Sequence, residues 1–368
     1  MKINQKKILF FFFILLLILI IYQFIQPYLF YNTTPIDIVY LWVDAEDIEW
    51  KMKRDNYIKQ YNQKINNINN TDTDEDHNED IEINTDAEII KNDTLPHDAL
   101  SNNHIYQMNE LYYSLLSVKK YMNWVRNIYI VVDEQKPQWF DELKSTKMPN
   151  IHLVDIREMM DEQYIPCYNS IAIETNLHKI PGLSEYFMYF NDDMFVGCPI
   201  SKKDIIRADG KIKVIPHQEK LALQYRNMSA HKYHILNMKF MLDHRFGEKE
   251  RQRIQHVPLV LRKSVYEEIW REFPREIERN HTSFRDKINF HIHYFVQWYM
   301  IEKKIAIMSY LPNIVLLSKY NTVYLERCFE NILQERYKLF CIQSFTDNPE
   351  KKSLYIDFIH KWSTILQS

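Results

Sequence analysis

Apolar runs that end in a polar or acidic residue recur along the first half of the chain. Their β-branched and aromatic residues are typical of buried strands. The runs lie at 36–43, 127–132, 151–154 and 186–190. Apolar residues over 108–122 recur at helical spacing, between the first two runs. This alternation of strand and helix predicts a parallel sheet with crossover helices.

The second half of the chain has a different pattern. After one further strand-like segment at 211–215, apolar residues recur mostly at helical spacing. The predicted helices are 233–242, 263–273, 286–301, 324–339 and 350–365. We therefore expect an α/β fold with a mostly parallel, Rossmann-like sheet, flanking helices and a helix-rich C-terminal half.

The N-terminal segment 1–30 predicts a membrane anchor. Lys2, Lys6 and Lys7 precede an apolar run from Ile8 to Tyr22, and a spanning helix needs roughly 17 residues. A cleaved signal peptide is the alternative, but the small residues of a cleavage site are missing. The lysines favour a cytoplasmic N-terminus. We expect one transmembrane helix in a single-pass type II protein of the Golgi or another secretory-pathway membrane, with a lumenal body.

The segment 62–103 differs in composition from its surroundings. Asn, Asp, Glu and Thr dominate it, and its acidic run shows no periodicity. Such a segment cannot bury enough apolar surface to become ordered. We predict a disordered insert within one domain that spans 31–368.

Composition excludes several classes of protein. The 368 residues include only 4 glycines, which rules out a G-x-G-x-x-G fingerprint and a Walker P-loop. The net charge of -3 gives no basic field for nucleic acid. The 4 cysteines have no C-x-x-C spacing, which argues against a structural zinc site. Oligomeric state stays open.

Among the acidic residues that follow the predicted strands, those at two strand ends are candidates for a site. Asn191, Asp192 and Asp193 come directly after 186–190, and Asp44 ends the run that starts at Ile36. Ligands of open α/β sheets collect at the carboxyl edge of the strands. Adjacent carboxylates there suit a divalent cation, which in turn suits a diphosphate. The alternative is a solvated acidic turn after a core strand.

A helix is predicted just before the strand at 186–190. Asn169 and Ser170 are good N-cap residues, and a helix from there to Lys179 would place Glu174 and His178 on one face. These side chains would then approach the acidic residues at the strand end. The alternative is an ordinary Glu–His pair on the surface of a helix.

Four blocks of sequence, in order, form a recognisable pattern. The first is 36–44. The second, from Asn109 to Gly197, is long and includes Leu177-His-Lys-Ile-Pro-Gly-Leu-Ser184 and Tyr189-Phe-Asn-Asp-Asp-Met-Phe195. The third runs from His256-Val-Pro258 to Ser283-Phe-Arg285, and a weak fourth surrounds Cys341. Together the blocks resemble the Stealth family of sugar-1-phosphate transferases, which includes bacterial capsule-polymer phosphotransferases and the α/β subunit precursor of lysosomal-enzyme N-acetylglucosamine-1-phosphotransferase. The resemblance covers roughly 36–61 and 105–305.

The resemblance implies transfer of a sugar-1-phosphate from a nucleotide-sugar donor to a hydroxyl of a glycan or glycoprotein, with release of UMP. Phosphoryl chemistry needs positioning and charge neutralisation, here with Mg²⁺ or Mn²⁺ held by Asp192 and Asp193. The implied catalytic residues are Glu174, Asp193, His256 and Arg285, with His256 as the base and Arg285 on the diphosphate. Candidate substrate-binding residues are Trp42, Asp44, Asn169, Ser170, His178 and Asn191.

Two departures from the family pattern leave alternatives open. Tyr112 and Leu116 replace two arginines of the second block, and the block around Cys341 carries extra residues. We therefore assign no catalytic role to the C-terminal region. A metal-dependent glycosyltransferase that moves only the sugar would show similar acids. A non-catalytic lumenal glycan-binding relative is the third possibility.

Overall fold

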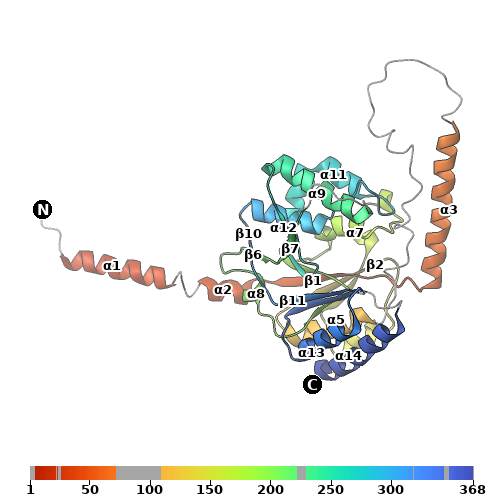
Figure 1. Cartoon of the computed structure of the whole chain (residues 1–368). Helices are drawn as coiled ribbons and strands as arrows, with labels where there is room; N and C mark the ends of the chain where they lie inside the picture. Colours follow the sequence, from red (N-terminus) through yellow and green to blue (C-terminus); the bar gives the residue numbers. More distant parts are fainter. Residues whose placement is uncertain are drawn as a thin grey trace, which may run out of the picture.

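Four parallel strands and one antiparallel strand form the central sheet (Figure 1). The structure is a computed structural model that describes residues 5–21, 23, 26–71, 109–221, 229–317, 319–343 and 348–367. In the order β3-β2-β1-β4-β9, the strands are Ile151–Asp155, Ile128–Val132, Ile36–Leu41, Tyr186–Asn191 and Leu259–Arg262. Only β9 is antiparallel to its neighbour. The expectation of an α/β fold with a mostly parallel sheet is confirmed.

The strands β1 and β4 lie side by side in the middle of the sheet. Their runs of apolar residues make this favourable, because side chains on both faces of a central strand are removed from water. Ile38, Tyr40 and Phe190 have no exposed surface. Leu41 is level with Asn191, so both strands end at the same edge. This register places Trp42 and its successors beside the turn that follows β4.

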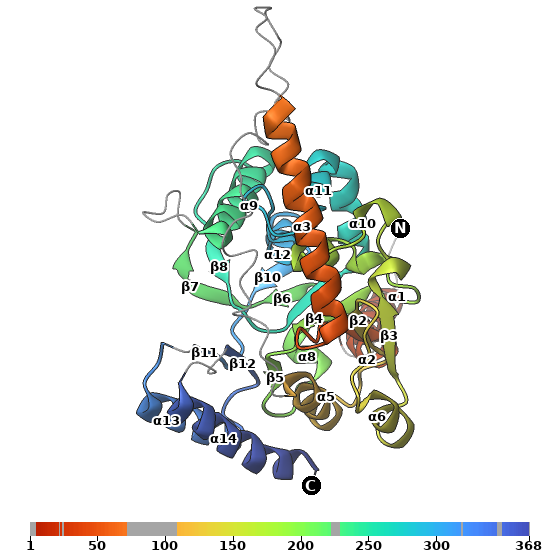
Figure 2. The same cartoon turned by 90° about the vertical axis from the view of Figure 1, so that its right-hand side faces the viewer.

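Helices cover both faces of the sheet. Figures 1 and 2 show α9, α11 and α12 on one side and α5, α13 and α14 on the other. The helices that carry or surround the site are α5 (Glu110–Tyr121), α7 (Ser170–Thr175), α9 (Ala230–Phe246), α10 (Lys263–Glu272), α11 (Pro274–Asn280), α12 (Ile292–Glu302), α13 (Thr322–Leu333) and α14 (Pro349–Gln367). The shorter helices are α2 (Gln26–Thr33), α6 (Phe140–Thr146) and α8 (Lys202–Ile205).

A second sheet joins the C-terminal region to the end of β4. It has the order β11-β12-β5, from Asn313–Leu317, Leu339–Gln343 and Met194–Val196. The strand β5 follows β4 after the turn at Asp192 and Asp193, and β12 pairs with it antiparallel, with Cys341 opposite Met194. Stacking of Phe195 on Phe340 at 4.9 Å secures this pairing. The C-terminal region therefore lies at the acidic turn.

The C-terminal half contains the expected helices, but several short strands and helix ends differ from the prediction. The predicted helix 324–339 ends at Leu333, and 286–301 becomes a helix only from Ile292. The additional strands are β7 (Pro216–Lys220), β8 (Gln252–Ile254), β10 (Ala306–Met308) and the strands β9, β11 and β12; the predicted strand at 211–215 is β6 (Ile212–Val214). Strands of three to five residues are too short to show a period, and their pairing partners are distant in sequence.

The N-terminal expectations are only partly addressed by the structure. The apolar segment forms α1 (Gln5–Ile20). Among the helices of the described residues, none combines the length and the apolar character that crossing a membrane requires. The predicted transmembrane helix is therefore not supported by the structure. The predicted disordered insert at 62–103 starts too early, because α3 (Ile48–Thr71) continues to Thr71. Residues 72–103 lie outside the described residues.

The helix predicted from Asn169 to Lys179 is shorter than expected. Asn169 is its N-cap, and the side chain accepts a hydrogen bond from Ile171 N. The helix α7 ends at Thr175, and a separate 3₁₀ turn covers Leu177–Lys179. His178 packs against Trp270 of α10, whereas Glu174 bonds His293 of α12. The two side chains therefore do not form the predicted pair on one helical face.

Candidate active site

Asp193 stands in the tight turn between β4 and β5. Its Oδ2 accepts a long hydrogen bond from Cys341 Sγ at 3.4 Å, while its Oδ1 is buried and has no hydrogen-bond partner in the described part of the chain. Burial, and then repulsion from Asp192, raise the pKa of Asp193 to about 8. Burial also raises the pKa of Asp192 to about 6. A buried carboxylate oxygen without a donor is the feature expected of a cation ligand.

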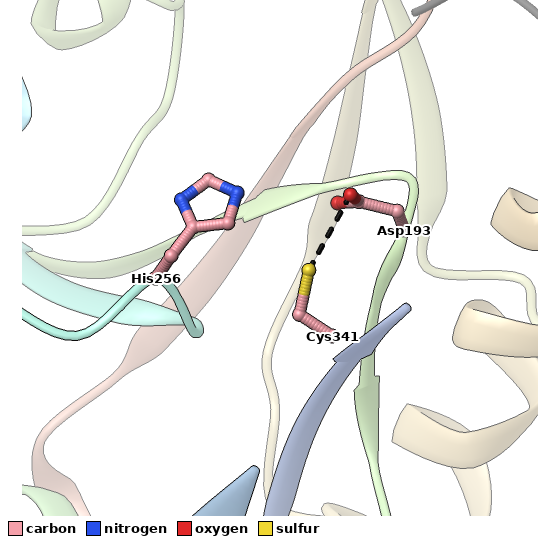
Figure 3. A group of neighbouring side chains, drawn as sticks. All are labelled: Asp193, His256 and Cys341. Carbon is pink, nitrogen blue, oxygen red and sulfur yellow. Dashed lines mark hydrogen bonds between the residues drawn. The ribbon is translucent and has the colours of Figure 1, made fainter. Parts of the chain in front are cut away.

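His256 and Cys341 complete a group around Asp193 (Figure 3). His256 comes from the loop before β9 and Cys341 from β12, and one ligand atom from each of the three residues lies within 4.8 Å of the others. Burial, and then the neighbouring His293, lower the pKa of His256 to about 4, so its imidazole is neutral at pH 7. A neutral imidazole is the form that binds a metal. We call Asp193, His256 and Cys341 the cation cluster.

The donor set of the cation cluster fits a divalent metal. It offers one oxygen, one nitrogen and one sulfur. The nitrogen and the sulfur suit Zn²⁺, whereas Mg²⁺ and Mn²⁺ prefer oxygen ligands. Burial, and then Asp193, raise the pKa of the Cys341 thiol well above its usual value, so it would lose its proton only with the cation in place. Asp192, which was predicted as a metal ligand, is not a member of this cluster in the described chain.

Glu174 lies in a second group of polar side chains next to β4. Its Oε2 is 2.8 Å from His293 Nδ1, and its Oε1 accepts a hydrogen bond from the Tyr189 hydroxyl at 2.9 Å. Burial alone would raise the pKa of Glu174, but His293, these two hydrogen bonds and Arg285 together lower it. Glu174 is therefore an ionised carboxylate whose charge is balanced inside the protein.

Asn191 and Arg285 border these two groups. The Tyr189 hydroxyl also lies 2.6 Å from Asn191 Oδ1, which links Glu174 to the residue that ends β4. Arg285 is exposed, and its Nη2 donates a hydrogen bond to Ser170 Oγ at 2.7 Å, at the start of α7. The guanidinium keeps further donors for a ligand. Arg285 and Ser170, both predicted site residues, are thus in contact.

Asn169 connects the start of α7 with the loop that carries Arg285. The side chain is completely buried, and its amide nitrogen contacts the Thr282 and Phe284 carbonyl oxygens and Asn289 Oδ1. These bonds fix the start of α7 against the loop that carries Arg285. The predicted role of Asn169 was substrate binding, whereas its side chain has no surface left with which to reach a ligand.

The other predicted site residues take three different positions. Asp44 follows β1 and binds the backbone, since Oδ1 accepts from Glu46 N at 2.9 Å. Trp42 is buried at the end of the same strand. His178 packs between Tyr266 and Trp270 of α10, with ring centroids 5.6 and 5.2 Å away. The structure brings together Glu174, Ser170, Asn191 and Arg285, and separately Asp193 and His256, whereas His178 lies apart.

Two residues of the site escaped the sequence analysis. Cys341 lies in the fourth block, where the extra residues led us to assign no catalytic role, yet its sulfur faces Asp193. His293 belongs to the segment His291-Ile-His-Tyr294 at the start of α12. Two histidines spaced two apart, at the start of a helix, were the available signal. Neither residue could be connected with its partner without the tertiary structure.

The fold and the site define an α/β protein whose ligand site lies at the carboxyl edge of a parallel sheet. Residues 104–214 match the family model described as Stealth protein CR2, conserved region 2. The chain is 30% identical over 331 residues to the capsular polysaccharide phosphotransferase cps12A of Actinobacillus pleuropneumoniae, covering 85% of this chain and 77% of that protein. The chain belongs to the Stealth family.

Further relatives support the same assignment. The capsular polysaccharide phosphotransferase cps1A of Actinobacillus pleuropneumoniae is 35% identical over 251 residues, which cover 66% of this chain and 58% of that protein. The chain thus spans little more than half the length of some curated relatives. Among solved structures, mouse xyloside xylosyltransferase 1 aligns with a TM-score of 0.35 at 11% identity, over 68% of this chain and 96% of that one. That likeness is too distant to carry an argument.

Proposed function

We propose that this protein transfers a sugar-1-phosphate from a nucleotide sugar, in particular a UDP-sugar, to a hydroxyl of a glycan or glycoprotein, and releases UMP. The observation that carries the proposal is the unpaired, buried Oδ1 of Asp193 within the cation cluster. Such an oxygen calls for a cation at the sheet edge where a donor diphosphate would lie. Relatives named as capsular polysaccharide phosphotransferases support this reaction class.

The residues of this chain divide the work of such a transfer. A divalent cation bound by Asp193, His256 and Cys341 would neutralise charge on the departing nucleoside phosphate. Arg285 is placed to grip diphosphate oxygens, since a planar guanidinium binds them in a bidentate manner. Its bond to Ser170 holds the side chain at the start of α7. Removal of Arg285 should therefore weaken donor binding as well as turnover.

Product analysis tests the reaction. The purified full-length protein is incubated with UDP- and GDP-sugars, separately with Mn²⁺, Mg²⁺ or Zn²⁺, and with a glycan acceptor. Release of UMP or GMP together with a phosphodiester-linked product supports the proposal. Release of UDP with transfer of the sugar alone would establish the glycosyltransferase alternative. The matched control is Glu278→Gln, because among the described residues the Glu278 side chain accepts its hydrogen bond from the Tyr164 hydroxyl, at 2.6 Å, on the exposed surface.

We also propose that the N-terminal segment tethers the protein to a secretory-pathway membrane, such as the Golgi membrane, with the body on the lumenal side. The support is the lysine-flanked apolar run from Ile8 to Tyr22. In sealed microsomes the body should resist added protease until detergent is present. Digestion of the body without detergent would contradict this topology.

A further inference from the structure

The pair formed by Glu174 and His293 resembles in its chemistry a carboxylate–imidazole pair of acid–base catalysis. Both side chains are buried, and Glu174 Oε2 lies 2.8 Å from Nδ1 of His293. Because Glu174 is ionised, its Oε2 accepts a hydrogen bond from Nδ1–H and thereby fixes the tautomer of the imidazole. The lone pair of that ring is then on Nε2, where a proton can be accepted.

The other nitrogen of His293 has no partner in the described part of the chain. Within those residues the hydrogen bond of the ring is the one from Nδ1 to Glu174. Tyr189 stacks on the ring at a centroid distance of 5.4 Å, and Tyr294 packs edge-on at 4.2 Å. These contacts fix the ring plane. Nδ1 is thus paired, while Nε2 has no partner among the described residues.

His256 is in a different situation. Its Nδ1 lies 2.9 Å from the Tyr294 hydroxyl, and its ring faces Asp193 and Cys341. No carboxylate of the described chain forms a hydrogen bond to its nitrogens. A histidine that binds a cation cannot at the same time accept a proton on that nitrogen. The resemblance assigned the base to His256, whereas the contacts give it the position of a cation ligand.

We propose that His293, positioned by Glu174, is the general base that takes the proton of the acceptor hydroxyl. This inference rests on the proposed function. The acceptor O–H bond breaks as its oxygen bonds to the phosphorus that carries the sugar, and the proton moves to His293 Nε2. The bond from that phosphorus to the nucleotide oxygen breaks, and its electron pair leaves with UMP. Glu174 stays ionised and stabilises the imidazolium.

The proximity of the two groups supports this division of roles. Tyr294, whose hydroxyl contacts His256, is the sequence neighbour of His293. Tyr189 bonds Glu174 and also contacts Asn191, two residues before Asp193. The base and the cation cluster are therefore connected through two tyrosines. An acceptor hydroxyl that reaches a cation-bound donor would approach both sides of this arrangement.

Variants at the two histidines separate the roles. His293→Asn keeps an amide near the position of Nδ1 for Glu174 but lacks Nε2, and His293→Ala leaves room for free imidazole. We expect both to lower acceptor-dependent turnover by about 10²–10⁴, the usual effect of losing a general base. Affinities for the donor and for Mn²⁺ should stay within a few-fold of the unsubstituted protein. Added imidazole should restore part of the turnover of His293→Ala.

The matched variant is His256→Ala. This substitution should lower the affinity for Mn²⁺. Its turnover should rise at higher Mn²⁺ concentration and should not rise when imidazole is added. All rates are taken per folded molecule, with thermal melting as the measure of folding.

The proposal is overturned if His293→Asn keeps normal turnover, if its loss merely follows the folded fraction, or if imidazole rescues His256→Ala instead of His293→Ala. The nucleotide released by the unsubstituted protein distinguishes a wrong base assignment from a wrong reaction. If this protein releases UMP but the His293 and His256 variants do not behave as expected, only the base assignment is wrong. If it releases UDP or no nucleotide, the proposed function fails and takes this inference with it.

Discussion

Asp193 and Glu174 are both carboxylates packed beside β4, and burial raises the pKa of each on its own account. In the case of Glu174 that effect is reversed by three neighbours, His293, Tyr189 and Arg285. The pKa of Glu174 is therefore below its usual value. For Asp193 the neighbouring charge is Asp192, which raises the pKa further, to about 8. The protein itself compensates the negative charge of Glu174. Asp193 has no such partner, and its charged form would need a bound cation.

This difference indicates which of the two carboxylates binds a cation. With a pKa of about 8, Asp193 is mostly protonated at pH 7 without a cation. A bound cation would stabilise the charged carboxylate and displace that proton. Asp193 combines an unpaired oxygen with nearby nitrogen and sulfur donors. Glu174 instead has a fixed internal partner and can act only through it. The cation and the base are thereby assigned to different groups.

The largest expected effect is at Asp193. Asp193→Asn keeps the shape of the side chain but removes the charge, so we expect turnover to fall at least about 10²–10³-fold, as for loss of one electrostatic contact in a transition state. Melting without metal at pH 7 should stay about the same, because Asp193, with a pKa of about 8, is mostly uncharged there already. The increase in melting temperature on addition of Mn²⁺ or Zn²⁺ should disappear. Near-normal turnover of Asp193→Asn, or activity unaffected by EDTA, would show that Asp193 does not bind a cation needed for turnover.

Glu174→Gln should have the opposite effect on stability. It removes a buried, charge-assisted hydrogen bond to His293, and we expect the free energy of unfolding to fall by about 1.5–3 kcal/mol with or without metal. Urea denaturation measures this. The surface variant Glu278→Gln, which also loses an acid bonded to a tyrosine, should change stability by no more than about 0.5 kcal/mol. Equal losses in the two variants would show that the burial of Glu174 contributes nothing.

The smallest expected effect concerns His178, away from both groups. Burial, and then Lys179 and Lys263, lower its pKa to about 3, whereas an unfolded histidine titrates near about 6.5. Below that pH, His178 binds a proton in the unfolded chain but stays unprotonated in the folded chain. The free energy of unfolding therefore falls as pH drops from about 6.5 toward 3. His178→Phe keeps the ring against Tyr266 and should make this loss shallower by up to about 1.4 kcal/mol per pH unit. Thermal melting at pH 7 and pH 5 measures it, and an unchanged slope contradicts it.

The sequence by itself determined the strands β1 to β4, since their apolar runs can be satisfied only by burial on both faces. It also placed Asp192 and Asp193 at a strand end, because the polar residues follow the run without a break. The N-cap Asn169 was recognisable for a similar reason, as capping depends on adjacent residues. Each of these features is local, so the periodicity and order of residues contain it.

The tertiary structure alone decided the partners within the site. Glu174 and His293 are 119 positions apart, and Asp193 and Cys341 are 148 apart. No periodicity connects such residues; pairing of β12 with β5 and packing of α12 against α7 bring them together. The end of α7 at Thr175, which separates His178 from Glu174, also depends on packing against α10 and α12. Long-range pairing depends on how whole elements fit together, which no local pattern of residues specifies.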